Sequence, residues 1–289
     1  MTKPVLEVVR ARIDVDGVPQ VDGLSLSTGG DRILILGSAQ ALFECVAGLR
    51  PVRHGAVDVR GVSAMLAVAE SSSAGVPLDP PLPPSWTVRA YVTWSARLAG
   101  HAAAEAHDRA TDALARLKLV DLQQATLRSL TLHARRAVVI AGALATGAST
   151  LLLEDPLRGL PGEAARTLAR LLVRATSDVS TVIFAPRVSL ASPLATDADE
   201  ALLIHGSRVV AQGAPGEVAA RDRAFALRLH RGGAAFARLA EERGARLEGH
   251  GAEWAMDLGH ALQTRDIFEI ATASDTVVLE IHPLAEAFA

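Results

Sequence analysis

Two adjacent carboxylates are the residues best suited to acid–base or metal chemistry. Glu154 and Asp155 come directly after residues 151–153, an all-leucine run typical of a strand that is covered on both faces. Paired acids at a strand end can hold Mg²⁺ or act as a general base. They can also face solvent or accept hydrogen bonds from a neighbouring loop. We favour this second interpretation, because the partner groups that catalysis needs are absent from the sequence.

A second candidate is the turn that follows residues 33–36, another continuous apolar run. The turn contains Gly37 and Ser38 and leads into a stretch with helical periodicity. A helix N-terminus alone offers only weak anion binding. The chain has two lysines, Lys3 and Lys118, and both are far from this turn in the sequence. A phosphate-binding loop with a lysine of its own is therefore excluded at this place.

The histidines and the cysteine predict neither a metal site nor a nucleophile. The nine histidines are scattered, with no pair spaced to share one helix face, and the only cysteine cannot supply a cysteine-based cluster. Cys45 lies between apolar neighbours in the stretch after Gly37. It is more typical of a small buried side chain than of a reactive thiol.

Composition narrows the class of protein. The net charge of −3 comes with no sustained basic stripe, which argues against a nucleic-acid partner. The longest uncharged run, residues 137–153, is interrupted by glycines and favours a buried helix followed by a strand over a membrane span. The first residues lack the apolar stretch of a signal peptide. We therefore expect a cytoplasmic protein without direct membrane insertion.

The elements that must position these residues alternate between strand and helix. The pattern predicts an α/β fold with a mostly parallel, doubly wound sheet. Strands are expected at 5–14, 20–27, 33–36, 56–61, 64–69, 151–153, 181–185 and 201–205. Helices are expected at 86–119, with a break near Gly100, and at 133–146 and 163–176. The Ser/Pro-rich residues 71–84 are expected to be irregular.

The last part of the chain changes character. Helices are expected at 215–228, 234–243 and 264–273, and strands on both sides of Gly249–Gly251 and at 276–281. This combination predicts a small C-terminal α+β extension. The expected domains are thus residues 1–220, with a helical subdomain at about 86–130, and residues 221–289.

Several short motifs, taken in order, resemble the ATP-binding subunit of ABC transporters. Residues 33–37 look like the strand that enters that family's phosphate loop, and residues 46–51 (VAGLRP) like the end of the next helix. Residues 130–131 resemble the start of the family's LSGGQ signature, and residues 151–160 (LLLEDPLRGL) resemble its Walker B strand. Residues 203–213 (LIHGSRVVAQG) resemble a hairpin of the family. The resemblance covers most of residues 5–220 and implies an ABC-type, P-loop-like ATPase domain.

Compared position by position, the resemblance implies that the ATPase chemistry has been lost. The lysine position falls on Ala39 and the Mg²⁺-binding hydroxyl on Gln40, and four loop residues are absent. The glutamine expected after the strand at 64–69 is absent as well. We therefore predict no catalytic residues, no metal site, and weak or no binding of ATP and Mg²⁺. The vestigial positions of the nucleotide site are Gly37, Ser38, Ala39, Gln40, Leu132 and His133 for the signature glycines, Glu154 and Asp155 for an inverted Walker B pair, and Arg187 for the switch histidine.

A partner surface is expected near the start of the helical subdomain. Trp86, Tyr91 and Trp94 gather there in a chain with few aromatic residues, and tryptophan and tyrosine are favoured at interfaces. The region resembles the stretch that receives a permease's coupling helix. The alternative is a flexible loop followed by a helix with ordinary core aromatics.

The resemblance therefore implies a degenerate, non-catalytic subunit, a pseudo-ATPase. It would serve as a docking, scaffold or regulatory part of a transporter complex at the inner face of the membrane. Residues 278–288 are similar to the end of subunits that serve exporters with separate permease chains. Expected partners are a permease, a related ABC ATPase, or a second copy as a homodimer. Two alternatives stay open: a divergent but active ATP-hydrolysing transporter subunit, and a soluble homodimeric structural or regulatory protein outside transport.

Overall fold

A computed structural model describes residues 3–220, 223–259, 262–284 and 287. Its central sheet has six strands in the order β10-β9-β3-β8-β7-β6. All are parallel except β10, which confirms the expected α/β class. The strands are β3 (Arg32–Gly37), β6 (Ser73–Val76), β7 (Thr150–Glu154), β8 (Ser180–Ala185), β9 (Glu200–His205) and β10 (Arg208–Gly213).

The continuous apolar runs arise because both faces of this sheet are covered. Along β3, Leu34 and Leu36 belong to the core on the side of the larger helices, whereas Ile33 and Ile35 belong to the core on the opposite side. The helices of the first layer are α5 (Leu132–Ala145), α6 (Gly162–Ala175) and the short α7 (Pro193–Asp197). On the opposite side lies α1 (Gln40–Val46), and α8 (Pro215–Ala219) follows β10.

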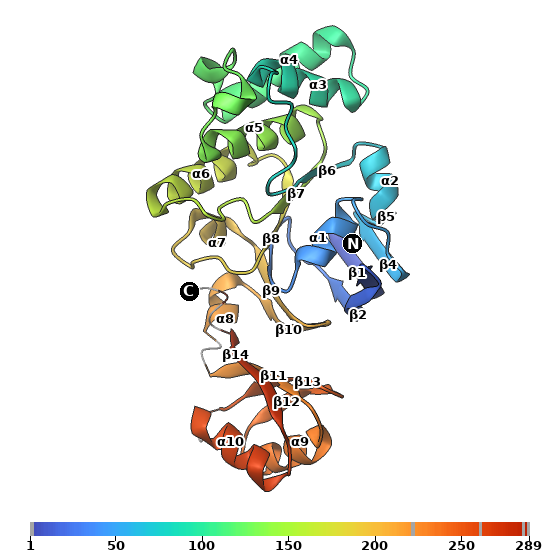
Figure 1. Ribbon diagram of the computed structural model, residues 1–289, viewed down its shortest axis with the longest axis vertical. Coiled ribbons are helices and arrows are strands. Elements are labelled where there is room, and N and C mark those ends of the chain that lie inside the picture. The colour runs from blue at the N-terminus through green and yellow to red at the C-terminus, as the bar shows by residue number, and fades with distance from the viewer. Residues whose placement is uncertain (1–2, 221–222, 260–261, 285–286, 288–289) are drawn as a thin grey trace.

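A second, antiparallel sheet covers the α1 side of the body (Figure 1). Its strand order is β2-β1-β4-β5. The strands are β1 (Leu6–Val15), β2 (Val18–Ser27), β4 (His54–Val59) and β5 (Val62–Ser63), and α2 (Ala64–Ala69) follows directly. The ring of Phe43 on α1 packs edge-on against Phe184 on β8, with 5.6 Å between the ring centroids. This contact joins α1 to the central sheet.

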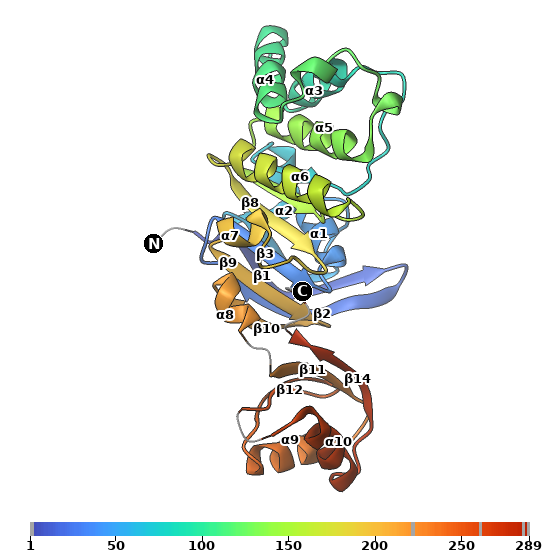
Figure 2. The same cartoon turned by 90° about the vertical axis from the view of Figure 1, so that its left-hand side faces the viewer.

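The helical subdomain lies at one end of the molecule and a C-terminal unit at the other (Figures 1 and 2). The subdomain contains α3 (Val88–Leu98), α4 (Ala103–Arg116) and two 3₁₀ turns, η1 (Val120–Leu122) and η2 (Leu127–Ser129). The predicted break near Gly100 is confirmed, because Gly100 has a φ of +95° between α3 and α4. Within the described residues, no helix is long and apolar enough to cross a membrane.

The C-terminal unit is a four-stranded antiparallel sheet with two helices. Its elements are β11 (Ala224–Leu229), α9 (Gly233–Glu242), β12 (Arg246–His250), β13 (Glu253–Asp257), α10 (Thr264–Ala273) and β14 (Val278–Pro283). The βαββαβ order and the strand order β12-β13-β11-β14 make it ferredoxin-like. The expected boundary at 220/221 adjoins residues 221–222, and the tail motif includes residues 285, 286 and 288. All of these lie outside the described residues.

Three predicted elements are wrong. Residues 64–69 form α2 and not a strand, because Ala64 and Ala67 are buried with helical spacing. Residues 73–76 form edge strand β6, so the irregular segment begins only at Pro77, where the prolines begin. Residues 224–229 form β11 and not the end of a helix. There the apolar side chains of Phe225, Leu227 and Leu229 alternate toward α9 and α10.

Candidate functional site

The turn after β3 is closed by neighbouring backbone. Gly37 has a φ of +89°, and a Cβ atom at this position would lie 2.1 Å from the carbonyl oxygen of Ile204 on β9. Only glycine tolerates both this conformation and this approach. The chain then enters α1 within two residues. The structure therefore leaves the turn without the length to wrap around a phosphate group.

The backbone donors of this turn are bonded within the protein. The N–H of Gly37 donates to the carbonyl of Pro186 (3.1 Å), that of Ser38 to Ile204 (3.1 Å) and that of Ala39 to Gly37 (2.9 Å). The Ala39 side chain is only 2% exposed and belongs to the core between the two sheets, whereas Gln40 is exposed. A phosphate cradle needs free N–H groups, a cation and a hydroxyl ligand for Mg²⁺. The residues present therefore do not fit a Mg²⁺–nucleotide.

The two acids lie beside this turn, and one of them, Glu154, binds the protein's own backbone. A cavity of about 240 Å³ is lined by Gly37, Ser38 and Ala39 together with Glu154 and Asp155. Glu154 Oε2 accepts a hydrogen bond from the N–H of Leu78 at 2.9 Å. The structure thus agrees with the interpretation of an acid that binds a neighbouring loop.

Asp155 has an unusual environment. Its backbone has a φ of +35°, and its N–H donates to the Phe184 carbonyl at 2.7 Å. Burial raises the pKa of the Asp155 carboxyl above its ordinary value, and the nearby guanidinium groups of Arg158, Arg136 and Arg187 oppose this shift. The described residues contain no group of three or more His, Cys, Asp or Glu side chains that could hold a metal ion.

Gln40 also lines this small cavity, whereas Leu132, His133 and Arg187 do not. Leu132 and His133 form the first turn of α5, where Thr131 caps the helix by accepting a hydrogen bond from the N–H of Ala134. Leu132 is 40% exposed, so its side chain occupies space where a signature glycine would leave the backbone open. Arg187 lies in the loop after β8.

Sequence reasoning placed the expected glutamine wrongly. The strand that precedes that position is β6 and not residues 64–69, and the residues that follow it are Pro77 and Leu78. No glutamine stands there either. The strand pattern of 73–76 was obscured by alanine and glycine, which are depleted in strands.

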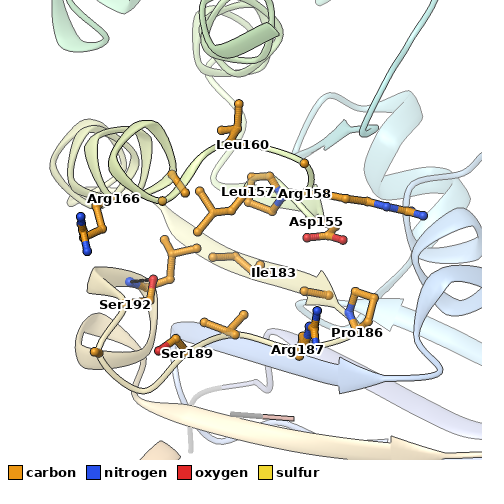
Figure 3. A pocket seen from close by; sticks show the side chains of 18 residues that line it. Asp155, Leu157, Arg158, Leu160, Arg166, Ile183, Pro186, Arg187, Ser189 and Ser192 are labelled. Atoms are coloured by element: carbon orange, nitrogen blue, oxygen red, sulfur yellow. Dashed lines mark hydrogen bonds between the residues drawn. The ribbon is translucent and has the colours of Figure 1, made fainter. Parts of the chain in front are cut away.

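A larger cavity, which the sequence analysis missed, opens between the loops after β7 and β8 (Figure 3). Its volume is about 1030 Å³, and it is bounded by α6 and α7 as well. Leu157, Leu160 and Ile183 form its apolar middle, while Arg158 and Arg166 point away from each other at opposite sides (Figure 3). Among the labelled polar groups, Asp155, Arg158 and Arg187 lie at one side of the cavity, and Arg166 and Ser192 lie at the other (Figure 3).

The three predicted interface aromatics are brought together. The rings of Trp86 and Trp94 pack edge-on with 5.5 Å between their centroids, and the ring centroid of Tyr91 lies 6.4 Å from that of Trp94. Trp86 and Tyr91 are half-buried against the large core. Trp94 is 43% exposed, and Leu98, one turn further along α3, is 66% exposed. The aromatic group is thus part of the core at its base and open to solvent at its outer side.

No protein-family model matches the chain. The cobalt import ATP-binding protein CbiO of Rhodobacter capsulatus is 36% identical over 120 residues, which is 41% of this chain and 42% of that protein. The match thus spans less than half of this relative's length. The taurine import ATP-binding protein TauB of Burkholderia pseudomallei is 27% identical over 207 residues, 70% of this chain and 75% of that protein.

Solved structures show the same fold. CbiO1 of Clostridium perfringens, part of the ABC transporter complex cbiONQ, has a TM-score of 0.65 at 22% identity. The match covers 75% of this chain and 91% of the CbiO1 chain. A nucleotide-free ATP-binding cassette from an ABC transporter has a TM-score of 0.63 at 16% identity, and the match covers 73% of this chain and 91% of that chain. The chain therefore has the ABC-type ATPase fold and is related in sequence to the ATP-binding subunits of ABC transporters.

Proposed function

We propose that the chain is a non-catalytic relative of these subunits, which docks on a permease and contributes structure or regulation rather than ATP hydrolysis. One observation carries the proposal: the N–H groups of Gly37, Ser38 and Ala39 are bonded to the protein's own carbonyls. Phosphoryl transfer depends on positioning and on neutralising the developing negative charge. A turn that has no lysine, and whose N–H groups at Gly37, Ser38 and Ala39 are already bonded, lacks these contributions.

Titration of the purified protein with Mg²⁺–ATP tests this proposal. A ligand of the native state at about 100 times its Kd stabilises that state by about 2.7 kcal/mol, which raises the melting temperature measurably. We expect no saturable heat of binding and no shift in melting temperature up to millimolar nucleotide. Mg²⁺–ADP under the same conditions serves as the control for ionic effects. A saturable shift with ATP contradicts the proposal.

The exposed side of α3 is the surface that we propose for the permease. Trp94 and Leu98 lie four residues apart on one helix face, and both are open to solvent. The fitting partner is an amphipathic helix from a cytoplasmic loop of the permease, whose apolar side chains would cover Trp94 and Leu98.

A co-expression experiment tests this surface. The chain is produced together with a candidate ABC permease chain, and the complex is isolated through a tag on that permease. We expect Trp94→Ala with Leu98→Ala to reduce recovery of the complex at least tenfold, as loss of a hot spot does. Phe268→Ala, which removes an apolar side chain that is 52% exposed on α10, is the matched control. Unchanged recovery in the folded double variant contradicts the assignment.

The alternative of an active ATPase rests on the acids at the end of β7. It predicts Mg²⁺-dependent turnover that Glu154→Gln or Asp155→Asn abolishes. The alternative of a homodimer outside transport predicts a stable dimer that does not associate with membrane proteins.

The direction of transport belongs to the proposal as well. The resemblance of residues 278–288 to exporter subunits favours export, whereas both relatives named above are import proteins. Our proposal extends to a permease-containing complex at the inner face of the membrane, with export as the direction that the tail motif favours.

A further inference from the structure

Residues 77–85, here named the proline segment, connect β6 to the aromatic surface on α3. Five of these nine residues are proline, so few backbone donors are available to hold the segment in place. At its far end the segment is held by a bond from the N–H of Arg128 to the carbonyl of Pro84, 3.3 Å long. At its near end the N–H of Leu78 donates to Glu154 at 2.9 Å.

A buried cation lies beside this near end. Arg136 on α5 is only 6% exposed, and its Nη1 donates to the carbonyl of Pro156 at 3.2 Å. Its Nε has no hydrogen-bond partner among the described residues. Burial lowers the pKa of Arg136, while the negative charges of Asp79 and Asp155 raise it. Asp79 belongs to the proline segment, so the positive charge of Arg136 attracts this segment without a direct ion pair.

The proline segment ends next to Trp86, whose carbonyl accepts a hydrogen bond from the N–H of Leu127 at 2.9 Å. Trp86 packs edge-on against Trp94. A stiff, proline-rich connection therefore runs from the Glu154 carboxylate to the exposed aromatic surface. A carboxylate that accepts a backbone N–H makes a charge-assisted hydrogen bond, which is stronger than a neutral one.

We infer that Glu154 is a positioning residue, which orients the Trp86–Trp94 surface for its partner by holding Leu78 at the start of the proline segment. This inference rests on the proposed function, because it assigns Glu154 to partner binding rather than to metal or base chemistry.

Three variants separate the reach of the side chain from its charge. Glu154→Gln keeps an oxygen acceptor at the same distance but has no charge. Glu154→Asp keeps the charge but is one methylene shorter, and Glu154→Ala removes the acceptor.

Hydrogen exchange of the Leu78 amide is measured in the full chain. We expect exchange about tenfold faster in Glu154→Ala and Glu154→Asp, and an intermediate rate in Glu154→Gln, which keeps a weaker, neutral acceptor. Glu163→Ala, an exposed acid on α6, is the control.

Recovery of the permease complex is the second readout. We expect Glu154→Gln to retain it and Glu154→Asp to lose it, although both variants unfold at similar denaturant concentrations. Equal Leu78 exchange in Glu154→Ala and the native chain overturns the inference, and so does loss of the complex in Glu154→Gln. The exchange measurement involves no nucleotide. A positive Mg²⁺–ATP titration therefore overturns the proposed function but leaves the exchange result for Leu78 unchanged.

Discussion

At the scale of single residues, the turn after β3 anchors one side chain, that of Ala39, in the core between the two sheets. Ala39 occupies the lysine position and is nearly inaccessible. Gly37 is retained because its φ and the approach of Ile204 require it. The sequence comparison identified the missing lysine, but it could not show that the remaining N–H groups bond to Pro186 and Ile204, because those partners lie far away in the sequence.

Restoring the lysine therefore does not restore the site. We expect Ala39→Lys to lower the free energy of unfolding by roughly 3 kcal/mol, because an unpaired cation enters an apolar environment, and to leave Mg²⁺–ATP unbound. Denaturant unfolding and calorimetry measure the two effects. Gln40→Lys adds the same charge at an exposed neighbour and should leave stability unchanged. Nucleotide binding by Ala39→Lys is the contrary result.

The buried thiol makes a second prediction at this scale. Burial raises the pKa of Cys45 to about 11, and alkylating reagents attack the thiolate. We expect iodoacetamide at pH 8 to modify the folded protein far more slowly than the same protein in denaturant, as followed by mass spectrometry. Because the folded pKa is raised, native stability is lost as the pH rises from the ordinary thiol value toward 11. Rapid labelling of the folded chain would show that the thiol is accessible.

At the scale of elements, long buried runs and strong helical periodicity were predictable, whereas short elements were not. The strands around Leu34 and Leu152 and the helices of the subdomain follow from the sequence pattern alone. Strand β6 and helix α2 do not, because each is short and gains its stability from tertiary contacts rather than from local preference. Glu154 was expected either to face solvent or to bind a loop, and its partner, Leu78, became identifiable only once β6 was placed beside β7.

The close contact between α3 and α5 allows a test at this scale. A Cβ atom at Gly142 would lie 2.9 Å from the Ser95 hydroxyl and 3.0 Å from the ring of Tyr91. We expect Gly142→Val to force the helices apart and to lower the free energy of unfolding by about 1–3 kcal/mol, with weaker recovery of the permease complex. Gly162→Ala, where a Cβ meets open space, is the control and should be close to neutral.

At the scale of the whole molecule, the C-terminal unit rests on the hairpin β9–β10 of the body. The Glu253 carboxylate accepts a hydrogen bond from the N–H of Ser207 at 3.1 Å, and Arg208 contacts His250. The rings of His205 and His282 lie 5.5 Å apart across this contact. On the C-terminal unit, these residues lie on the face of its sheet that α9 and α10 do not cover. This explains why β12, β13 and β14 carry polar side chains on that face.

The contact predicts a loss of stability in mild acid. Burial lowers the pKa of His205, and His282 and Arg228 lower it further, while Glu253 and Glu280 act in the opposite direction. Because the folded pKa lies below the unfolded one, stability is present above about pH 6.5 and is lost as the pH falls through the folded value. Denaturant unfolding at pH 7.5 and 5.5 should show a smaller decrease for His205→Asn than for the native chain. His54→Asn, at an exposed position, should decrease like the native chain.

The closed turn after β3 has a consequence for the protein in a living cell. Enzymes that draw part of their folding energy from a bound nucleotide become easier to degrade when cellular energy runs low. Here the turn is satisfied by its own chain, so starvation should leave the lifetime of the protein unchanged. Under the proposed function, a complex that contains this chain therefore has one component whose abundance is independent of the supply of ATP.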